Sequence, residues 1–147
     1  MSDVQQAQKV LVTGVFDILH QEHLSFLRKA KQLGYLVVAI ESDVRVKKLK
    51  GEGRPINNQD TRLENLRKLK IADEVFILPE QFSSPDDHRR LLQKIRPAVL
   101  AVSSHSPHLD KKASLMKEIG GTVEIVHQHN PEISTTLFLE QRNKNNG

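Results

Sequence analysis

The chain has 147 residues, of which 37% are hydrophobic and 27% charged, and this length and composition are typical of one soluble globular domain spanning residues 1–147. Its 22 Lys and Arg residues exceed its 18 Asp and Glu residues, which suits an anionic ligand, but five Phe, one Tyr and no Trp give no stacking surface for nucleic acid. The absence of cysteine excludes disulfides, thiolate metal sites and cysteine nucleophiles, and the absence of an apolar signal core or of an apolar run near ~20 residues predicts a cytoplasmic protein outside the membrane.

The first half of the chain alternates between strand and helix. Residues 10–12 form a short apolar strand, and apolar residues at helical spacing between 24 and 33 predict a helix that Gly34 ends. The continuous apolar run 36–40 is typical of a strand buried on both faces. Residues 44–57 are basic and contain two glycines and a proline, so we expect a mobile loop, with or without a short helical turn at its start.

The alternation continues through the second half. A helix over 63–69 and a strand over 74–78 come next, and Ser84 with the following proline and two aspartates forms a strong helix start. That helix ends near Arg96, and residues 99–102 form the fourth strand. The remaining predicted elements are a helix around 115–119, a strand over 123–126 and a last helix that begins at Thr135 after a capping Ser134.

Strands that alternate with helices form parallel sheets with right-handed crossover connections. The predicted fold class is therefore α/β, with a Rossmann-like five-stranded parallel sheet and helices on both faces. Such sheets bind their ligands beyond the carboxyl ends of the strands, where the strand order switches. The residues that follow each strand are accordingly the first place to look for a site.

The segment after the first strand carries the strongest candidate chemistry. Gly14 leaves room for the backbone to approach a ligand, and His20 and His23 share one face of a helix that starts near them. Two imidazole N–H donors at a helix N-terminus make a site for phosphate oxygens. A zinc site is the alternative, but it needs a third ligand, and the adjacent Glu22 points to a different side of the helix. The Gly-x-Gly-x-x-Gly pattern of dinucleotide folds is absent.

Three motifs occur in order along the chain. They are the segment Gly14-Val15-Phe16-Asp17-Ile18-Leu19-His20-x-x-His23, the basic loop over 47–56 followed by Arg62, and the segment Ile133-Ser134-Thr135-Thr136. Together they resemble the cytidylyltransferase-like nucleotidyltransferases, a family that includes glycerol-3-phosphate cytidylyltransferase, heptose-1-phosphate adenylyltransferase and archaeal FAD synthase. The resemblance extends over residues 9 to 141.

The resemblance implies an enzyme that joins a nucleotide from a nucleoside triphosphate to a small phosphorylated acceptor and releases pyrophosphate, by positioning and charge stabilisation. It implies that His20, His23 and Lys50 are catalytic and that Asp17 fixes the loop. The nucleotide-binding residues that it implies are Gly14, Val15, Phe16, Arg62, Ser134 and Thr135. Mg²⁺ is expected to accompany the triphosphate, with no residue predicted as a metal ligand, and the resemblance also allows for a homodimer.

Several of these roles have structural alternatives. Lys50 could be one of several solvated lysines, and Ser134 could serve only as an N-cap. Arg62 could pair with Asp60 or Glu64 on its own helix. The other histidines, which we expect to lie in loops with only the last near the nucleotide, are His105, His108, His127 and His129.

Two departures from the family pattern leave the function partly open. Glu22 stands where the family has a glycine that lets the nucleobase pack flat against the helix start, so its carboxylate repels the triphosphate, swings aside or accepts a hydrogen bond from a base amino group. Residues 102–106 leave the base identity open. We expect an active nucleotidyltransferase that favours ATP over CTP, with a sugar phosphate as acceptor. A catalytically weakened relative that acts as a nucleotide sensor or partner-binding module, and a different ligand-binding α/β module, are the alternatives.

Overall fold

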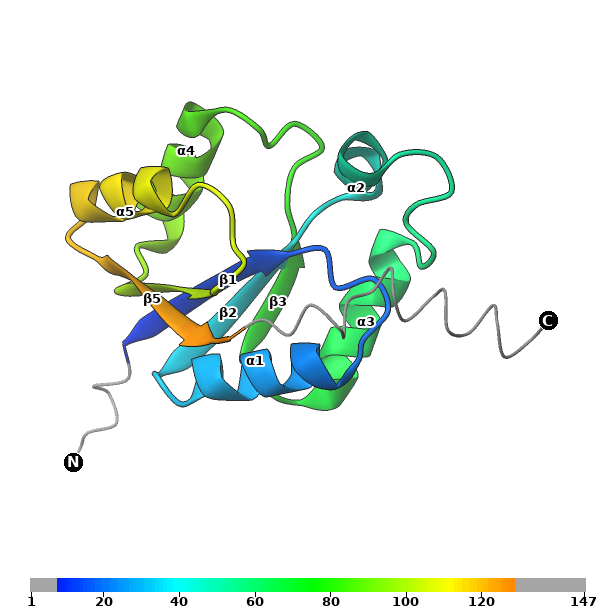
Figure 1. Ribbon diagram of the computed structural model, residues 1–147, viewed down its shortest axis with the longest axis horizontal. Coiled ribbons are helices and arrows are strands. Elements are labelled where there is room, and N and C mark those ends of the chain that lie inside the picture. The colour runs from blue at the N-terminus through cyan, green and yellow to red at the C-terminus, as the bar shows by residue number, and fades with distance from the viewer. Residues whose placement is uncertain (1–7, 129–147) are drawn as a thin grey trace.

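The computed structural model describes residues 8–128, which form a parallel sheet between two layers of helices (Figure 1). The strands are β1 (Lys9–Gly14), β2 (Tyr35–Ile40), β3 (Glu74–Ile77), β4 (Val99–Ser103) and β5 (Thr122–His127). They pair in the order β3-β2-β1-β4-β5, and every pairing is parallel. The predicted Rossmann-like α/β class and all five predicted strands are therefore confirmed.

The helices cover both faces of the sheet, as predicted. They are α1 (Gln21–Lys31), α2 (Asp43–Lys50), α3 (Gln59–Leu69), α4 (Pro85–Ile95) and α5 (Leu109–Glu118). Leu27 of α1 and Leu66 of α3 pack on the face that includes Val10, whereas Leu92 of α4 packs with Leu11 on the other face. Neighbouring residues of one strand point to opposite faces, so a continuous apolar run serves both layers. None of the helices in the described part of the chain combines the length and the apolar character that a membrane span needs.

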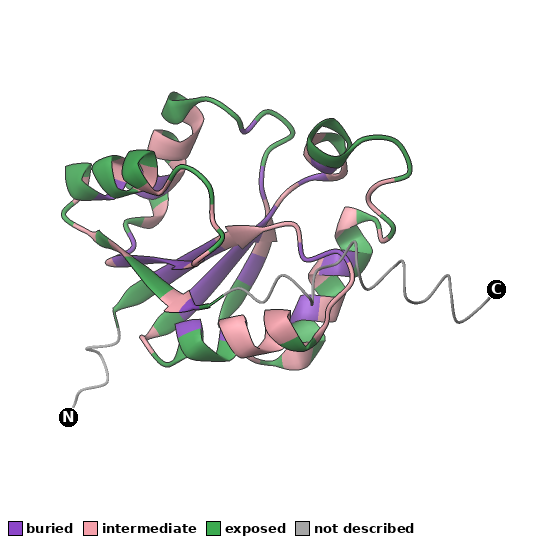
Figure 2. Cartoon of the chain, viewed as in Figure 1, coloured by how far each residue is buried: buried purple, intermediate pink, exposed green. Residues whose placement is uncertain are grey.

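The most deeply buried residues lie in the central strands. Figure 2 shows the buried residues gathered in the sheet and the exposed ones on the outer helix surfaces. Val10, Leu11 and Val12 of β1 are fully buried, and so are four of the five residues from 36 to 40 in β2, the fifth being 2% exposed. These apolar runs anchor the strand from which the first motif emerges.

The α2 segment differs from the sequence-based expectation. Residues 43–50 form a regular helix rather than part of a mobile loop. The Ser42 side chain caps this helix by accepting a hydrogen bond from the Arg45 backbone N–H, and Val46 is its one buried residue. A single buried apolar residue leaves no periodic signal in the sequence, so the helix is stabilised by its cap and by tertiary packing that the pattern does not reveal.

The strand order creates a crevice beside β1. The chain runs outward from β1 through β2 to β3, then crosses back so that β4 pairs with the free side of β1. The β1 and β4 strands pair only through Val10 with Val99 and Leu11 with Leu100, so they are not paired towards their carboxyl ends. This is the switch point at which parallel α/β sheets bind ligands.

Candidate functional site

A cavity of about 480 Å³ lies at this switch point. Its lining comes from six places in the chain: the end of β1 with the loop after it, the first turns of α1, the end of α2 with the loop after it, β4 with the loop after it, Lys112 of α5, and the end of β5. The predicted residues that line it are Gly14, Val15, Phe16, His20, His23 and Lys50. Folding therefore gathers the first motif and the basic loop around one space.

The β1–α1 loop is shaped by Phe16. This residue has φ 50°, in the left-handed region, and it is only 6% exposed. A Cβ atom on Gly14 would lie 2.8 Å from Cε2 of the Phe16 ring, closer than such atoms can approach. The glycine is thus required by the packing of its own loop, in addition to any approach of a ligand to the backbone.

The two motif histidines form a capping box at the start of α1. Nδ1 of His20, the N-cap residue, accepts a hydrogen bond from the Glu22 backbone N–H at 3.2 Å, and the His20 backbone N–H donates to Nδ1 of His23 at 3.3 Å. The two rings are stacked with centroids 4.0 Å apart. Because both Nδ1 atoms accept hydrogen bonds, each neutral ring carries its proton on Nε2. The pair therefore offers N–H donors at a helix N-terminus.

The environment of His23 keeps its imidazole neutral. The pKa of His23 is lowered from 6.5 to about 4, chiefly by burial and then by the charge of the neighbouring His20. The Glu22 carboxylate and a hydrogen bond to the Ile18 backbone oppose this shift without cancelling it. At neutral pH His23 is consequently a hydrogen-bond donor and not a proton source.

Asp17 holds the basic loop against the β1–α1 loop. Its buried carboxylate accepts hydrogen bonds from the backbone N–H groups of Ile56 at 2.7 Å and Asn57 at 2.8 Å, and the Asn57 side chain donates to the Asp17 carbonyl. The prediction that Asp17 fixes the loop is confirmed. These hydrogen bonds hold together two segments that are about forty positions apart in the chain, and both segments line the same cavity.

Two cations of the basic segment line the cavity beside the histidines. Lys50 ends α2, and its pKa is lowered chiefly by burial of its ammonium group and then by the charge of Arg54, while Asp17 opposes the shift. Arg54 was not among the predicted site residues. Its side chain is 15% exposed, its Nε lies 3.5 Å from Asp17 Oδ2, and its buried Nε and Nη2 atoms have no hydrogen-bond partner among the described residues. A buried guanidinium with unused donors is a signal that only the folded structure provides.

Arg62 lies outside the lining of the cavity. Its side chain is fully buried, and its guanidinium donates to the backbone carbonyls of Val15, Glu41 and Asn57 and to the Asp43 carboxylate, all at 2.8 to 3.0 Å. Its acidic partner is thus on α2 and not on its own helix. The contact of Arg62 with phosphate stays a prediction. The structure shows that Arg62 connects the β1–α1 loop, the segment after β2, helix α2 and the loop before α3.

Glu22 and His127 meet at another part of the cavity wall. The Nε2 atom of His127 lies 3.0 Å from Glu22 Oε1, and its Nδ1 atom lies 3.0 Å from Nζ of Lys29. His127 was expected in a loop, but it is the buried last residue of β5, and its carbonyl accepts a hydrogen bond from the Ser104 backbone N–H. The expectation was wrong because the polar sequence after Val126 gives no sign that the strand continues.

His105 does lie in a loop that lines the cavity, and His108 is the N-cap residue of α5.

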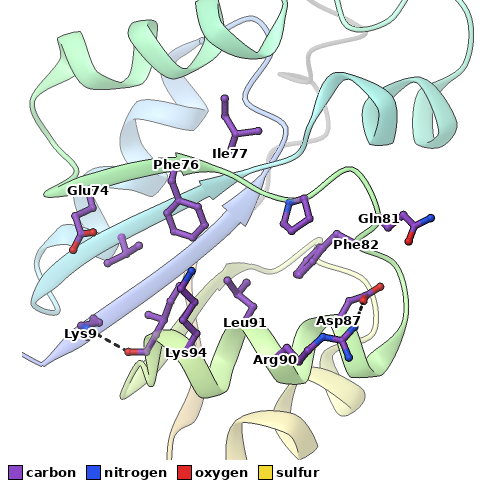
Figure 3. Close-up of a pocket in the computed structure, with 13 residues that line it drawn as sticks. Lys9, Glu74, Phe76, Ile77, Gln81, Phe82, Asp87, Arg90, Leu91 and Lys94 are labelled. Carbon is purple, nitrogen blue, oxygen red and sulfur yellow. Dashed lines mark hydrogen bonds and ion pairs between the residues drawn. The ribbon is translucent and has the colours of Figure 1, made fainter.

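A larger cavity of about 850 Å³ lies between β3 and α4, away from these motifs. Figure 3 shows Phe76, Phe82 and Leu91 forming its apolar floor, with Arg90 and Lys94 on the adjoining helix. Arg90 is paired with Asp87 at 2.6 Å. None of the motif residues lines this space, so the smaller cavity at the switch point is the candidate site.

Comparison with known proteins fits this arrangement of motifs and fold. A family model described as cytidylyltransferase-like matches residues 11–144. The chain belongs to this family. The Bifunctional protein HldE of Pseudomonas putida is 37% identical over 139 residues, and the corresponding protein of Yersinia pestis is 34% identical over the same length. Each alignment covers 92% of this chain and 28% of the relative, so the chain spans little more than a quarter of these proteins.

Solved structures agree with the family assignment. The lipopolysaccharide core biosynthesis protein from Thermoplasma volcanium is 26% identical, with a TM-score of 0.66 over 84% of this chain and 97% of that protein. A pantothenate synthetase from Thermus thermophilus has a TM-score of 0.58 at 15% identity, over 93% of this chain and 64% of that one, a likeness of fold alone. The cytidylyltransferase-like motif from Gly14 to His23 therefore sits on the fold that its sequence predicts.

The third family motif falls outside the described residues. Ser134 and Thr135, together with His129, belong to the stretch 129–147, so their predicted contacts with nucleotide stay predictions. Within residues 8–128, no group of three or more His, Asp and Glu side chains is placed to hold a metal ion. The two carboxylates that line the cavity are Asp17 and Glu22, and the first is committed to backbone N–H groups.

Proposed function

We propose that this protein is a nucleotidyltransferase that transfers a nucleoside monophosphate from ATP, or alternatively CTP, to a small sugar-phosphate-like acceptor and releases pyrophosphate. The observation that carries the proposal is the pair of stacked histidines at the N-terminus of α1, which line the switch-point cavity together with Lys50 and Arg54. Imidazole and backbone N–H donors beside two cations suit a triphosphate. Membership of the cytidylyltransferase-like family supports the same reaction class.

The reaction is an in-line displacement at the α-phosphorus. An anionic phosphate oxygen of the acceptor forms the new bond to that phosphorus, while the bond from the phosphorus to the oxygen that bridges to the β-phosphate breaks. Pyrophosphate leaves with the electron pair of that bond, and no proton transfer is needed. The two histidines donate hydrogen bonds to the phosphoryl oxygens as the charge on these oxygens redistributes, and Lys50 and Arg54 neutralise the leaving pyrophosphate.

Mg²⁺ enters this scheme as part of the nucleotide substrate. Mg²⁺ keeps several waters and binds through phosphate oxygens with few protein carboxylates, which suits a cavity with two lining carboxylates, of which Asp17 is committed to backbone N–H groups. We therefore assign the metal to the triphosphate and place no resident metal on the protein.

Two resemblances favour ATP and a sugar phosphate. The loop Lys50-Gly51-Glu52-Gly53-Arg54-Pro55 resembles that of the heptose-1-phosphate adenylyltransferases. The relative from Thermoplasma volcanium is described as a lipopolysaccharide core biosynthesis protein, a description that suggests work on sugars. A homodimer and a cytoplasmic location are also proposed, on the family resemblance and on the composition of the chain.

The matched variants His20→Asn and His23→Gln test the catalytic role of the pair. Asn is a favourable N-cap residue and Gln completes a capping box at the third helical position, so both variants keep α1 capped while they remove the imidazole donors. We expect pyrophosphate release with ATP and a panel of sugar phosphates to fall by ~10²-fold or more in each variant, as for loss of a preorganised donor. Thermal unfolding should change little.

Unchanged turnover in both variants would show that the pair is structural and would overturn the catalytic assignment. The second candidate function is a weakened relative that binds nucleotide as a sensor, which the carboxylate of Glu22 beside a polyanion site favours. It would be indicated by calorimetric binding of triphosphate to the wild-type protein without pyrophosphate release for any acceptor. Release with CTP alone would reverse the preference for ATP.

A further inference from the structure

Two groups of side chains in the wall of the switch-point cavity differ in their chemistry. One group, formed by His20, His23, Lys50 and Arg54, presents N–H donors and positive charge. The other, which we name the Glu22 end, consists of Glu22, Phe26 and His127. A nucleoside triphosphate has the same division, because its phosphates are anionic while its base is a flat, uncharged ring with hydrogen-bonding edges. The donor-rich group suits the phosphates, and the Glu22 end, which offers a carboxylate acceptor and an aromatic ring, suits the base.

The Glu22 end is built by one stripe of α1 against the carboxyl end of β5. Glu22, Phe26 and Lys29 lie at positions i, i+4 and i+7, which share one face of a helix. All three contact His127: the carboxylate at 3.0 Å from Nε2, the ammonium group at 3.0 Å from Nδ1, and the Phe26 ring with its centroid 6.4 Å from that of the imidazole. The ribbon in Figure 1 shows the end of β5 beside α1.

The partners of His127 determine which way its proton points. An ammonium group only donates hydrogen bonds, so Lys29 donates to Nδ1, and the imidazole proton is on Nε2. The Nε2–H group then donates to Glu22 Oε1. The side chains of His127 and Glu22 are 8% and 18% exposed, so this hydrogen bond forms with little competition from water. The carboxylate is thereby held in a fixed orientation at the cavity wall.

We propose that Glu22, positioned by His127, selects the nucleobase by accepting a hydrogen bond from an exocyclic amino group. A carboxylate is an acceptor only, so it pairs with the amino group of adenine or cytosine, as Glu and Asp do with cytosine in nucleic-acid recognition. A keto oxygen at the same position would face the carboxylate acceptor to acceptor. The cavity therefore favours ATP or CTP over ITP or UTP. This selection rests on the proposed function, because it needs a triphosphate in the cavity.

Calorimetric titration of the wild-type protein with the magnesium complexes of ATP, ITP, CTP and UTP tests the selection without any acceptor. We expect ITP and UTP to bind about tenfold or more weakly than their amino counterparts, the scale of one good base contact. In Glu22→Gln, whose amide can accept or donate, the ratio of the ITP to the ATP dissociation constant and the ratio of the UTP to the CTP dissociation constant should both approach one. The control Glu64→Gln removes a carboxylate that is 57% exposed on α3 and should keep the wild-type ratios.

His127 acts through Glu22 and is a positioning residue, so its variants are judged by the same ratio. His127→Phe removes the donor and should reduce the preference in affinity for ATP over ITP. His127→Gln keeps an N–H donor and should retain most of this preference. Equal binding of ATP and ITP by the wild-type protein, or an unchanged ratio in Glu22→Gln, would overturn the base-reading role. Failure of all four triphosphates to bind would overturn the proposed function itself, so the two failures are distinguishable.

Discussion

At the scale of single residues, Arg54 brings an incompletely paired positive charge into the cavity wall. Its guanidinium is largely buried beside Lys50, and two of its nitrogen atoms have no hydrogen-bond partner among the described residues. An unpaired buried donor is destabilising, so these nitrogen atoms are suited to an acceptor that arrives from solution. Phosphate oxygens, which accept several hydrogen bonds from an arginine fork, have the matching chemistry.

Replacement of Arg54 by methionine should therefore separate stability from binding. We expect Arg54→Met to weaken triphosphate affinity by about tenfold or more, because charge-assisted hydrogen bonds are lost. The free energy of unfolding should stay within about 1 kcal/mol of the wild type or rise, because an incompletely paired buried charge is removed. Calorimetry and urea unfolding measure the two quantities, with Arg28→Met on the exposed side of α1 as the matched control. A marked loss of stability with unchanged affinity would mean that Arg54 is a structural residue.

His23 should make stability depend on pH. Its pKa is about 4 in the folded protein and 6.5 when unperturbed, so between these values the unfolded chain binds a proton that the folded protein does not. The free energy of unfolding should thus decrease as the pH falls from 6.5 towards 4, and this loss should be absent in His23→Gln. Urea unfolding of both proteins at pH 7 and pH 4.5 gives the comparison. An identical pH dependence in the two would contradict the assignment of a buried neutral imidazole.

At the scale of elements, Arg62 connects the segments that surround the cavity. From α3 its guanidinium reaches the carbonyls of Val15 in the β1–α1 loop and Glu41 after β2, and the carboxylate of Asp43 on α2. One fully buried side chain thus fixes the loop that carries Phe16 and the helix that carries Lys50. Its removal would leave the Asp43 carboxylate and buried carbonyl groups without their donor.

We expect Arg62→Leu to lower the free energy of unfolding by about 3–5 kcal/mol, the usual cost of breaking a buried charged network. Arg62→Lys should also be destabilising, because an ammonium group cannot reproduce the planar fork that reaches these acceptors. Urea unfolding measures this effect, and triphosphate titration of the folded protein measures binding. A stable Arg62→Lys variant with weakened triphosphate binding would instead support the phosphate contact that the family resemblance implies.

At the scale of the whole molecule, the sheet is most deeply buried at its centre, and the candidate site lies beside the central strand β1. β1 is paired on both sides and buried under both helix layers, and it leads directly into the first motif. β5 is an edge strand, and its Ile125 is 51% exposed. The site is thus anchored to the centre of the sheet on one side and completed by an edge strand, through His127, on the other.

Two truncations of aliphatic side chains should reflect this difference. Leu11→Ala in β1 should lower the free energy of unfolding by about 2–5 kcal/mol, because it opens a cavity in a fully buried position. Ile125→Ala in β5 should change it by about 1 kcal/mol or less, because the side chain is half exposed. Chemical unfolding of both variants tests the comparison. Similar losses in the two would mean that the edge strand is packed more tightly than its exposure indicates.

The sequence by itself determined the alternating strands and helices, the α/β class and the place of the first motif. These features depend on local patterns: apolar runs that fill both faces of a strand, a capping Ser84 that accepts from the Asp87 backbone N–H, and the close spacing of His20 and His23. The role of Asp17 in fixing the loop could also be predicted, because Asp17 matches a position of the family motif to which the resemblance assigns that role.

Only the tertiary structure decided the pairing of Glu22 with His127, the burial of Arg62 and the presence of Arg54 donors that no residue from 8 to 128 accepts. Each depends on contacts between residues far apart in the chain, 105 positions in the case of Glu22 and His127. The spacing of apolar residues in the sequence does not predict such a contact, because the contact is produced by the order of strands in the sheet and by the packing of α1 against β5. A buried charge acquires its role from the groups that folding brings to it, and a single sequence does not contain that neighbourhood.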